Sequence, residues 1–317
     1  MKARIRDFLV TKQDWIFSVV SYELLDEGSV KSLIRYVPDE RGERVSERGR
    51  YRKLDFHEGY KFLMQHRPEY VKEVHVVPKC DIKAILRPEV RLPVIAEREE
   101  EIRTIYDLLR AHVPKDTIGI TGSFLCGLNG EGSDYDFVVY GRKNFNTVRA
   151  VIEKAKEGAF IHDINDAMWS RIYAKRKPEL SYEEFVTHEQ RKSNRGVIGN
   201  TYFDILYVRD RTEMDLFDHR IYVQGAKKGY ATITAEVKDA SFSFDSPAIY
   251  EIDHPQINVV LSFTHTYTGQ ALEGETIEAR GVLEQIGDET RLVVGTTREA
   301  KGEWIKSLSL IENSSSH

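Results

Sequence analysis

Two polar pairs at the ends of apolar runs constrain this chain more than any other feature. Gly122 and Ser123 follow one such run, while Asp134 and Asp136 begin another at residues 135–140. Short apolar runs of this kind predict strands. Because alternate residues of a strand point to one face, both carboxylates would project from the same side of a sheet. Two carboxylates held so close repel each other unless a cation lies between them.

The carboxylate pair predicts a divalent cation as cofactor, because hard oxygen ligands favour Mg²⁺ or Mn²⁺. The Gly-Ser pair complements it. Gly122 lets the backbone approach a phosphate, and Ser123 with the N–H groups of the next turn can bind phosphate oxygens. Either pair alone is typical of an ordinary loop or turn. Their joint spacing predicts a site that holds a triphosphate together with its metal.

A third carboxylate on a neighbouring strand would bind metal and orient or deprotonate an attacking hydroxyl. Asp204 is the preferred candidate, because a charge inside the apolar run 202–208 is costly without a metal or a partner. Asp163 and Asp166 are alternatives, but their surroundings are typical of a helix start. The catalytic and metal-binding set predicted from the sequence is therefore Asp134, Asp136 and Asp204.

These residues resemble the nucleotidyltransferase superfamily named after DNA polymerase β. The pattern is a Gly-Ser pair, about ten residues, an Asp-x-Asp pair in a strand, and a lone Asp in a later strand. Ser133 and Gly127 also fit it. The resemblance covers about residues 97–210 and extends to uncharacterised archaeal proteins that are predicted nucleotidyltransferases. The gap between Asp136 and Asp204 is longer than the pattern requires.

The resemblance implies an α+β fold whose central mixed sheet, the polymerase β-like palm, carries the site. It also implies the activity: metal-dependent transfer of a nucleoside monophosphate from a nucleoside triphosphate such as ATP, with release of pyrophosphate. By the same resemblance, Gly122, Ser123 and Ser133 would contact the nucleotide. The acceptor would be a hydroxyl of RNA, a protein or a small molecule. Ser133 has a simpler explanation as the cap of a turn.

The chain is long enough for two or three domains. Strands predicted at 15–24, 30–37 and 71–77, with a helix at 55–65 capped by Asp55, suggest a small α+β domain over residues 1–93. Two prolines in 87–93 argue against regular structure there. A central domain over 94–214 would contain helices at 97–113, 146–157 and 182–191 and strands at 117–121, 135–140 and 202–208.

Short strands at regular spacing follow from about residue 216. We expect them at 220–223, 229–237, 257–264, 276–284 and 291–296, with 304–311 closing the set. Turn residues between them favour an all-β barrel, OB-like, or a sandwich over 215–312. Residues 313–317 are predicted to be a disordered tail.

Composition excludes several other classes. With two cysteines at unrelated positions, neither a disulfide framework nor a cysteine zinc site is supported. The N-terminus lacks a secretory pattern and no run reaches about 18 apolar residues, so we expect a cytoplasmic protein without a membrane partner. Phosphate-loop, zinc-protease and hydrolase motifs are absent from the sequence.

Nucleic acid is a possible partner only through local basic segments, because the net charge is −5. Arg195, in the basic segment 191–196, is a candidate contact for the triphosphate, with a solvated loop as the simpler explanation. A second basic segment, 41–53, is compatible with an RNA-binding arm or with a plain solvated hairpin. The alternative to an enzyme is a non-catalytic module that keeps the fold and binds nucleotide or nucleic acid.

Overall fold

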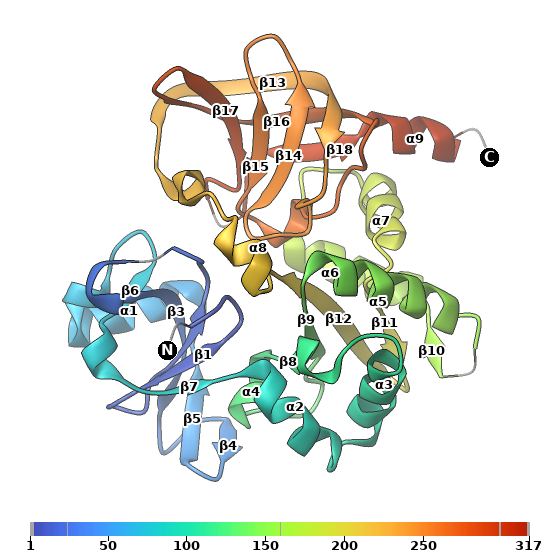
Figure 1. Ribbon diagram of the computed structural model, residues 1–317. Helices are drawn as coiled ribbons and strands as arrows, with labels where there is room; N and C mark the ends of the chain where they lie inside the picture. The colour runs from blue at the N-terminus through green and yellow to red at the C-terminus, as the bar shows by residue number, and fades with distance from the viewer. Residues whose placement is uncertain (1–2, 24, 159, 298, 316–317) are drawn as a thin grey trace. The chain divides into compact units, whose positions relative to one another are not determined.

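The chain forms two compact units. The computed structural model describes residues 3–23, 25–158, 160–297 and 299–315 (Figure 1). Unit 1 comprises Met1–Val151 and Val197–Val208, and unit 2 comprises Ile152–Gly196 and Arg209–His317. The chain therefore leaves unit 1 and returns to it for one segment. Both predicted polar pairs and Asp204 belong to unit 1.

Unit 1 begins with a sheet that, in the described residues, has seven strands in antiparallel pairs. Six follow the order β4-β5-β3-β2-β1-β7, and β6 pairs with β3. The strands are β1 (Phe8–Thr11), β2 (Ile16–Val19), β3 (Val30–Pro38), β4 (Arg44–Ser46), β5 (Gly49–Lys53), β6 (His75–Val77) and β7 (Ile82–Leu86).

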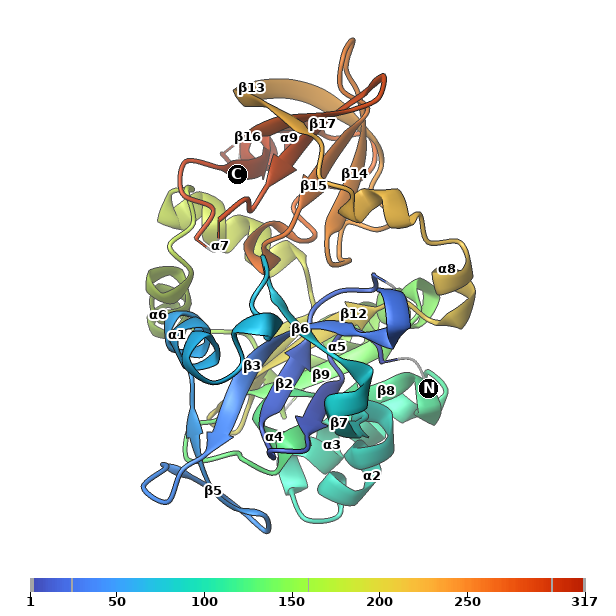
Figure 2. The same ribbon diagram turned by 90° about the vertical axis from the view of Figure 1, so that its left-hand side faces the viewer.

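Helix α1 (Phe56–His66) lies beside β3 (Figure 2). Its start follows from a capping box: the Asp55 carboxylate accepts a hydrogen bond from the Glu58 N–H at 2.8 Å, and Glu58 accepts one from the Asp55 N–H at 2.8 Å. Leu63 is fully buried in the core that α1 forms with the sheet. The predicted helix with Asp55 as N-cap is confirmed.

The segment 87–93 corrects one prediction, because it is largely helical. It forms most of α2 (Pro88–Ala96). Pro88 occupies the first turn, where a backbone N–H has no helical partner to lose, and Pro93 removes a single internal hydrogen bond. Burial of Leu92, which is 0% exposed, offsets that loss. Tertiary packing has overridden the local preference.

A second sheet carries the predicted site, and among the described residues it has five strands in the order β10-β11-β12-β9-β8, with β10 at Ile161–His162 and β11 at Arg195–Ile198. In it β12 (Thr201–Val208) runs parallel to β9 (Tyr135–Tyr140), and β9 runs antiparallel to β8 (Ile118–Ile120), so the sheet is mixed as predicted. Helix α2 packs directly on β8: a Cβ added to Gly119 would lie 2.5 Å from the Cβ of Pro88. Three helices accompany this sheet in the sequence: α3 (Glu100–Arg110), α4 (Gly122–Cys126) and α5 (Arg142–Ala155).

The two sheets of unit 1 share a hydrophobic core. Leu125, Cys126 and Leu128, from α4 and the residues that follow it, cluster with Phe8 of β1 and Tyr36 of β3. All five are less than 9% exposed. The N-terminal strands therefore pack against the element that begins with the predicted Gly-Ser pair, which positions them beside the site.

Unit 2 begins with helical segments. Its elements before the barrel are β10 (Ile161–His162), α6 (Asp166–Arg176), α7 (Tyr182–Arg191) and α8 (Arg211–Asp215), while β11 (Arg195–Ile198) runs from unit 2 into unit 1 along the chain. The predicted helix 182–191 has the same bounds as α7. Ser181 caps it in a second capping box, since its side chain accepts from Glu184 N and the Glu184 carboxylate accepts from Ser181 N.

The rest of unit 2 contains a closed five-stranded barrel. The order is β13-β14-β15-β17-β16, and β16 pairs back to β13. One pair, β15–β17, is parallel. The strands are β13 (Ala226–Asp239), β14 (Ala248–Asp253), β15 (Val259–Ser262), β16 (Thr276–Ile286) and β17 (Glu289–Val294); β18 (Trp304–Ser307) adds to β16, and α9 (Leu308–Ser315) follows.

The barrel was predicted as a class, but two of its details differ. Residues 220–223, predicted as a strand, lie mostly in a 3₁₀ helix at His219–Tyr222. Strand β14 was missed, because proline and aspartate around it suggested a loop. Of the predicted tail, residues 313–315 belong to α9, and 316–317 lie outside the described residues.

In the part of the chain that the structure describes, no helix has both the length and the apolar character needed to cross a bilayer.

Candidate active site

Asp136 and Asp204 are brought together by the register of two strands. They are Cα partners in the parallel β9–β12 pair. Partners of this kind present their side chains on the same face of a sheet. Asp204 is only 5% exposed, and Asp136 is partly exposed. Asp134 directly precedes β9 and is also partly exposed.

Gly122 approaches the Asp136 carboxylate closely. The Thr121 N–H donates to the Asp136 carbonyl at 2.8 Å, which ties the start of α4 to β9. Gly122 has a φ of +69°, and a Cβ placed on it would lie 2.6 Å from Asp136 Oδ2. Only glycine therefore fits here without displacing the carboxylate. The predicted Gly-Ser and Asp-x-Asp pairs are neighbours in space.

The two serines have different surroundings. Ser123 is the second residue of α4, is partly exposed, and accepts a hydrogen bond at its carbonyl from Leu128 N at 2.9 Å. Ser133 closes a turn: its Oγ accepts from Gly130 N at 3.0 Å and from Arg44 Nη1 at 3.4 Å. Ser133 thus acts as the turn cap that was its simpler explanation.

The carboxylates of the candidate site can be compared with the ligands that a divalent cation needs. Among the residues that the structure describes, no three His, Cys, Asp or Glu side chains form a ready-made metal site. The Asp136–Asp204 register and the space kept open by Gly122 nevertheless provide two oxygen donors beside a cradle that a Cβ would fill. Asp134 lies two residues before Asp136. These residue types and positions fit Mg²⁺ or Mn²⁺.

Arg6 is a site residue that the sequence reasoning missed. Its carbonyl accepts a hydrogen bond from Thr121 Oγ1 at 2.7 Å, and its φ of +75° is uncommon for a side-chain-bearing residue. Burial lowers the pKa of the Arg6 guanidinium, while the charges of Asp136 and Asp204 act in the opposite direction. Arg6 therefore brings a cation close to both carboxylates.

The segment around Arg6 is anchored on both sides. The Arg4 guanidinium lies 4.0 Å from the centroid of the Tyr140 ring and pairs with Glu89, which also accepts a hydrogen bond from the Tyr140 hydroxyl at 2.9 Å. Asp7 is fully buried, and burial raises the pKa of its carboxyl to about 6. The sequence signal was available: three charged residues, Arg4, Arg6 and Asp7, directly precede a buried strand, and buried charges need partners.

Arg195, the predicted triphosphate contact, lies in unit 2 and is 2% exposed. Its guanidinium pairs with Glu189, which also pairs with Arg176 and Lys192. Glu189 is the carboxylate at the centre of these ion pairs, and its side chain is 0% exposed. The structure thus gives Arg195 a buried partner in Glu189. Arg195 also begins β11, the strand next to β12, which carries Asp204, in the sheet order.

The basic segment 41–53 forms the β4–β5 hairpin. Arg44 contacts Ser133, and Arg52 pairs with Asp39 at 3.3 Å and with Glu58 at 3.7 Å. Arg44 and Arg52 of this segment therefore have partners within unit 1.

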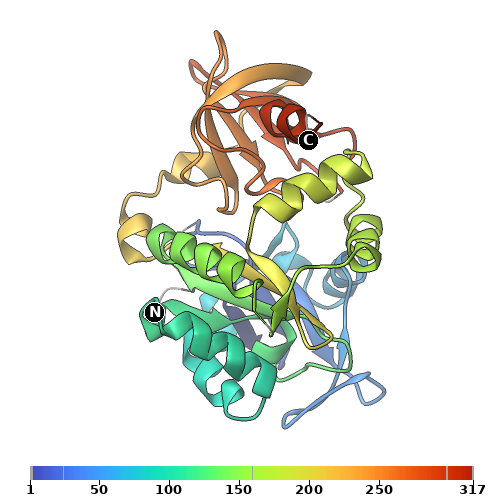
Figure 3. The ribbon, with the colours of Figure 1, turned by 90° about the vertical axis from the view of Figure 1, so that its right-hand side faces the viewer.

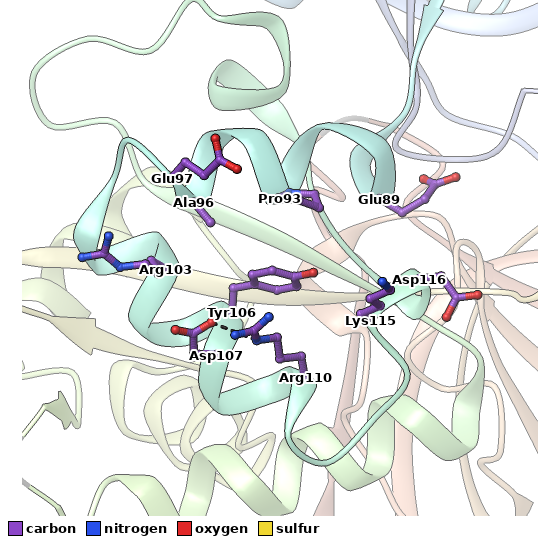
Figure 4. A pocket seen from close by; sticks show the side chains of 10 residues that line it. All are labelled: Glu89, Pro93, Ala96, Glu97, Arg103, Tyr106, Asp107, Arg110, Lys115 and Asp116. Carbon is purple, nitrogen blue, oxygen red and sulfur yellow. Dashed lines mark ion pairs between the residues drawn. The ribbon is translucent and has the colours of Figure 1, made fainter.

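A groove of about 560 Å³ lies elsewhere in unit 1, at α2 and α3, which lie side by side (Figure 3). Tyr106 and Pro93 form its apolar part, and charges of both signs surround them, including Glu97, Arg103 and Lys115 (Figure 4). None of the predicted site residues lines it. Its mixed charges carry no signature of a triphosphate site, so the register of Asp136 and Asp204 is the better guide to the chemistry.

Comparison with known proteins identifies a domain in the part of the chain that contains these residues. The family described as "Nucleotidyltransferase domain" matches residues 102–222, which include both polar pairs and Asp204. The uncharacterised protein MJ1086 of Methanocaldococcus jannaschii is 37% identical over 341 aligned positions, which cover 96% of this chain and 99% of that protein. No solved structure matches the chain.

Proposed function

Because the chain belongs to the same family as MJ1086 and carries a nucleotidyltransferase domain, we propose that it transfers a nucleoside monophosphate from a nucleoside triphosphate to a hydroxyl acceptor. The acceptor is an RNA, a protein or a small molecule, and pyrophosphate is released. The reaction depends on Mg²⁺ or Mn²⁺.

One observation carries this proposal: Asp204 is the register partner of Asp136, on the face where Gly122 leaves room beside the carboxylate. Asp134, Asp136 and Asp204 would hold the metal. When bound, the metal would neutralise charge on the phosphates and on the attacking and leaving oxygens.

The chain's own residues would supply the rest. The acceptor oxygen forms a bond to the α-phosphorus while the bond from that phosphorus to the bridging oxygen of pyrophosphate breaks. Asp204 is the candidate to take the proton of the hydroxyl. Gly122 and Ser123 would face the phosphates, and Arg6 supplies a positive charge close to Asp136. Catalysis would come mainly from positioning and electrostatics.

The decisive experiment incubates the purified protein with α-labelled triphosphates, Mg²⁺ or Mn²⁺, and RNA, protein and small hydroxyl compounds as acceptors. We expect labelled acceptor and pyrophosphate with the unmodified chain, and neither with Asp136→Asn. Asp116→Asn is the control, since Asp116 is an exposed aspartate of unit 1.

The competing reading is a binding module without catalysis. It would replace the proposal if triphosphate bound equally well in the presence of a chelator and after Asp136→Asn, and if no acceptor became labelled. We also propose domain boundaries near residues 93 and 214, an OB-like barrel and a cytoplasmic location. The closed strand order supports the OB-like barrel.

A further inference from the structure

The outer face of the barrel in unit 2 carries a row of aromatic and cationic side chains. In the strand register, Arg280 of β16 lies opposite Trp304 of β18, and Tyr230 of β13 lies two residues along from Thr232, which is opposite Arg280. The Arg280 guanidinium carbon is 5.4 Å from the centroid of the Tyr230 ring and 5.7 Å from that of Trp304. We call these three residues the Tyr230 face.

Hydrogen bonds hold two members of this row, Arg280 and Trp304, in place. Arg280 Nε donates to the Gly302 carbonyl at 2.9 Å, and Trp304 Nε1 donates to Glu278 Oε1 at 3.0 Å. Tyr230 is 54% exposed, so one aromatic ring of the face remains open to solvent. An exposed ring beside a fixed guanidinium can stack with a flat partner, and a tyrosine side chain has only two rotatable angles to order.

Charge distinguishes this face from the neighbouring side of the barrel. Lys227 and Lys228, which precede Tyr230 on β13, are exposed, and no carboxylate among the described residues forms an ion pair with them. At the other end of β13, and on β14, the exposed charges are Glu236, Lys238, Glu251 and Asp253, with Lys238 and Asp253 paired at 2.9 Å. That side has a net negative charge and repels phosphate. On the Tyr230 face Glu278, which accepts from Trp304, is paired with Lys306 at 3.3 Å, so Arg280, Lys227 and Lys228 leave the face positive.

We propose that the Tyr230 face binds single-stranded RNA. An unpaired base would stack on Tyr230, the edge of the Arg280 guanidinium would extend the stacking surface, and Lys227 and Lys228 would contact the backbone phosphates. Aromatic rings and arginine planes are the usual platforms for unpaired RNA bases. A duplex is unsuitable, because its bases are already stacked and paired.

The test uses fluorescence anisotropy with a labelled single-stranded RNA of about 12 nucleotides. It is run without triphosphate and with a chelator. We expect Tyr230→Ala to weaken binding roughly tenfold or more, and Tyr230→Phe to retain binding because the ring is kept. Lys228→Ala should weaken binding and reduce the slope of log affinity against log salt by about 0.7. The matched control is Lys238→Ala, which removes a lysine from the other end of the same strand.

Several results would overturn the proposal. One is the same affinity for Tyr230→Ala and the unmodified chain; another is equal binding of double-stranded RNA. Lys227, Lys228 and the register shift beside them could serve only to protect an open strand edge. In that case Lys228→Ala would increase aggregation and leave RNA affinity unchanged, which would also overturn it.

The proposal is separable from the proposed function. Asp136→Asn should bind the RNA with unchanged affinity, because Asp136 belongs to unit 1 and the Tyr230 face to unit 2. RNA binding that Asp136→Asn retains and Tyr230→Ala weakens would therefore support the Tyr230 face even if no acceptor were labelled. Far-UV circular dichroism of each variant shows whether the barrel is folded.

Discussion

Asp136 and Asp204 are register partners in parallel strands although 67 residues separate them in the sequence. A strand pair that places two carboxylates side by side must offset their repulsion. Close to them lie the cation of Arg6 and the space beside Gly122. The first three predictions below follow from these features.

Replacing either carboxylate should abolish nucleotidyl transfer with little effect on folding. We expect Asp136→Asn and Asp204→Asn each to lower the rate roughly 100-fold or more, about 3 kcal/mol of barrier, because each removes a negatively charged oxygen donor. Rates are measured with labelled triphosphate at saturating Mn²⁺. The control is Asp166→Asn, at the start of α6, which should retain full activity. If Asp166→Asn lost as much activity as Asp204→Asn, Asp166 would become a candidate for the third carboxylate.

Gly122→Ala and Gly127→Ala form a matched pair. Both glycines have positive φ, +69° and +66°, so alanine costs about 1 kcal/mol of backbone strain at each. Only at Gly122 would the new Cβ meet Asp136; around Gly127 the space is open. We expect similar losses of stability in denaturant unfolding, and loss of Mn²⁺ binding and transfer in Gly122→Ala alone. Equal activity in both variants would contradict the close approach.

Arg6→Gln should raise the affinity for Mn²⁺ in the absence of triphosphate. Removing a positive charge close to Asp136 and Asp204 removes its repulsion of the cation, and we expect roughly a fivefold gain, about 1 kcal/mol. Electron paramagnetic resonance of free Mn²⁺ measures it. Arg110→Gln in α3 is the control, and an equal affinity in the two variants would rule out electrostatic coupling.

Glu189→Gln should destabilise unit 2. It leaves the cations of Arg176, Lys192 and Arg195 without the carboxylate that pairs with all three, and we expect a loss of about 3 to 5 kcal/mol in the free energy of unfolding. Glu183→Gln, exposed on the same helix, is the control.

Arg195→Gln tests the nucleotide-binding role predicted for that residue. If its pairing with Glu189 is its whole role, this variant lowers stability and leaves the affinity for triphosphate unchanged. Weaker triphosphate binding by a folded variant would instead support the contact predicted from the sequence.

Unit 2 should lose stability in acid through His188. Burial lowers the pKa of His188 to about 4; its Nε2 accepts from Ser307 N at 2.9 Å and its Nδ1 lies 2.6 Å from the Glu184 carbonyl. Histidine in the unfolded chain has a pKa near 6.5, so above that pH His188 is neutral in both states. As the pH falls from about 6.5 to about 4, the unfolded chain takes up a proton that the folded chain does not, and about 3 kcal/mol of stability is lost.

His188→Gln should therefore flatten the pH dependence of unfolding over that interval. Denaturant titrations at pH 7, 5.5 and 4 measure it. The exposed His112→Gln should keep the pH dependence of the unmodified chain. If His188→Gln had the same pH dependence as the unmodified chain, folding would not lower the pKa of His188.

Much of this protein was determined by the sequence itself. Local patterns placed β9 and α7 at their observed bounds, the Asp55 cap at the start of α1, and a barrel near the C-terminus. These features depend on neighbouring residues, whose periodicity and capping chemistry are visible in a short window. The residues proposed for the site were also found there, because carboxylates in apolar strands are costly without a partner.

Tertiary structure alone decided the rest. The pairing of Asp136 with Asp204, the position of Arg6, and the burial of Arg195 beside Glu189 depend on register and packing between distant segments. Helix α2 formed despite two prolines because burial against β8 outweighed local preference. Such relationships depend on free energies shared among many contacts, so no short stretch of sequence encodes them by itself.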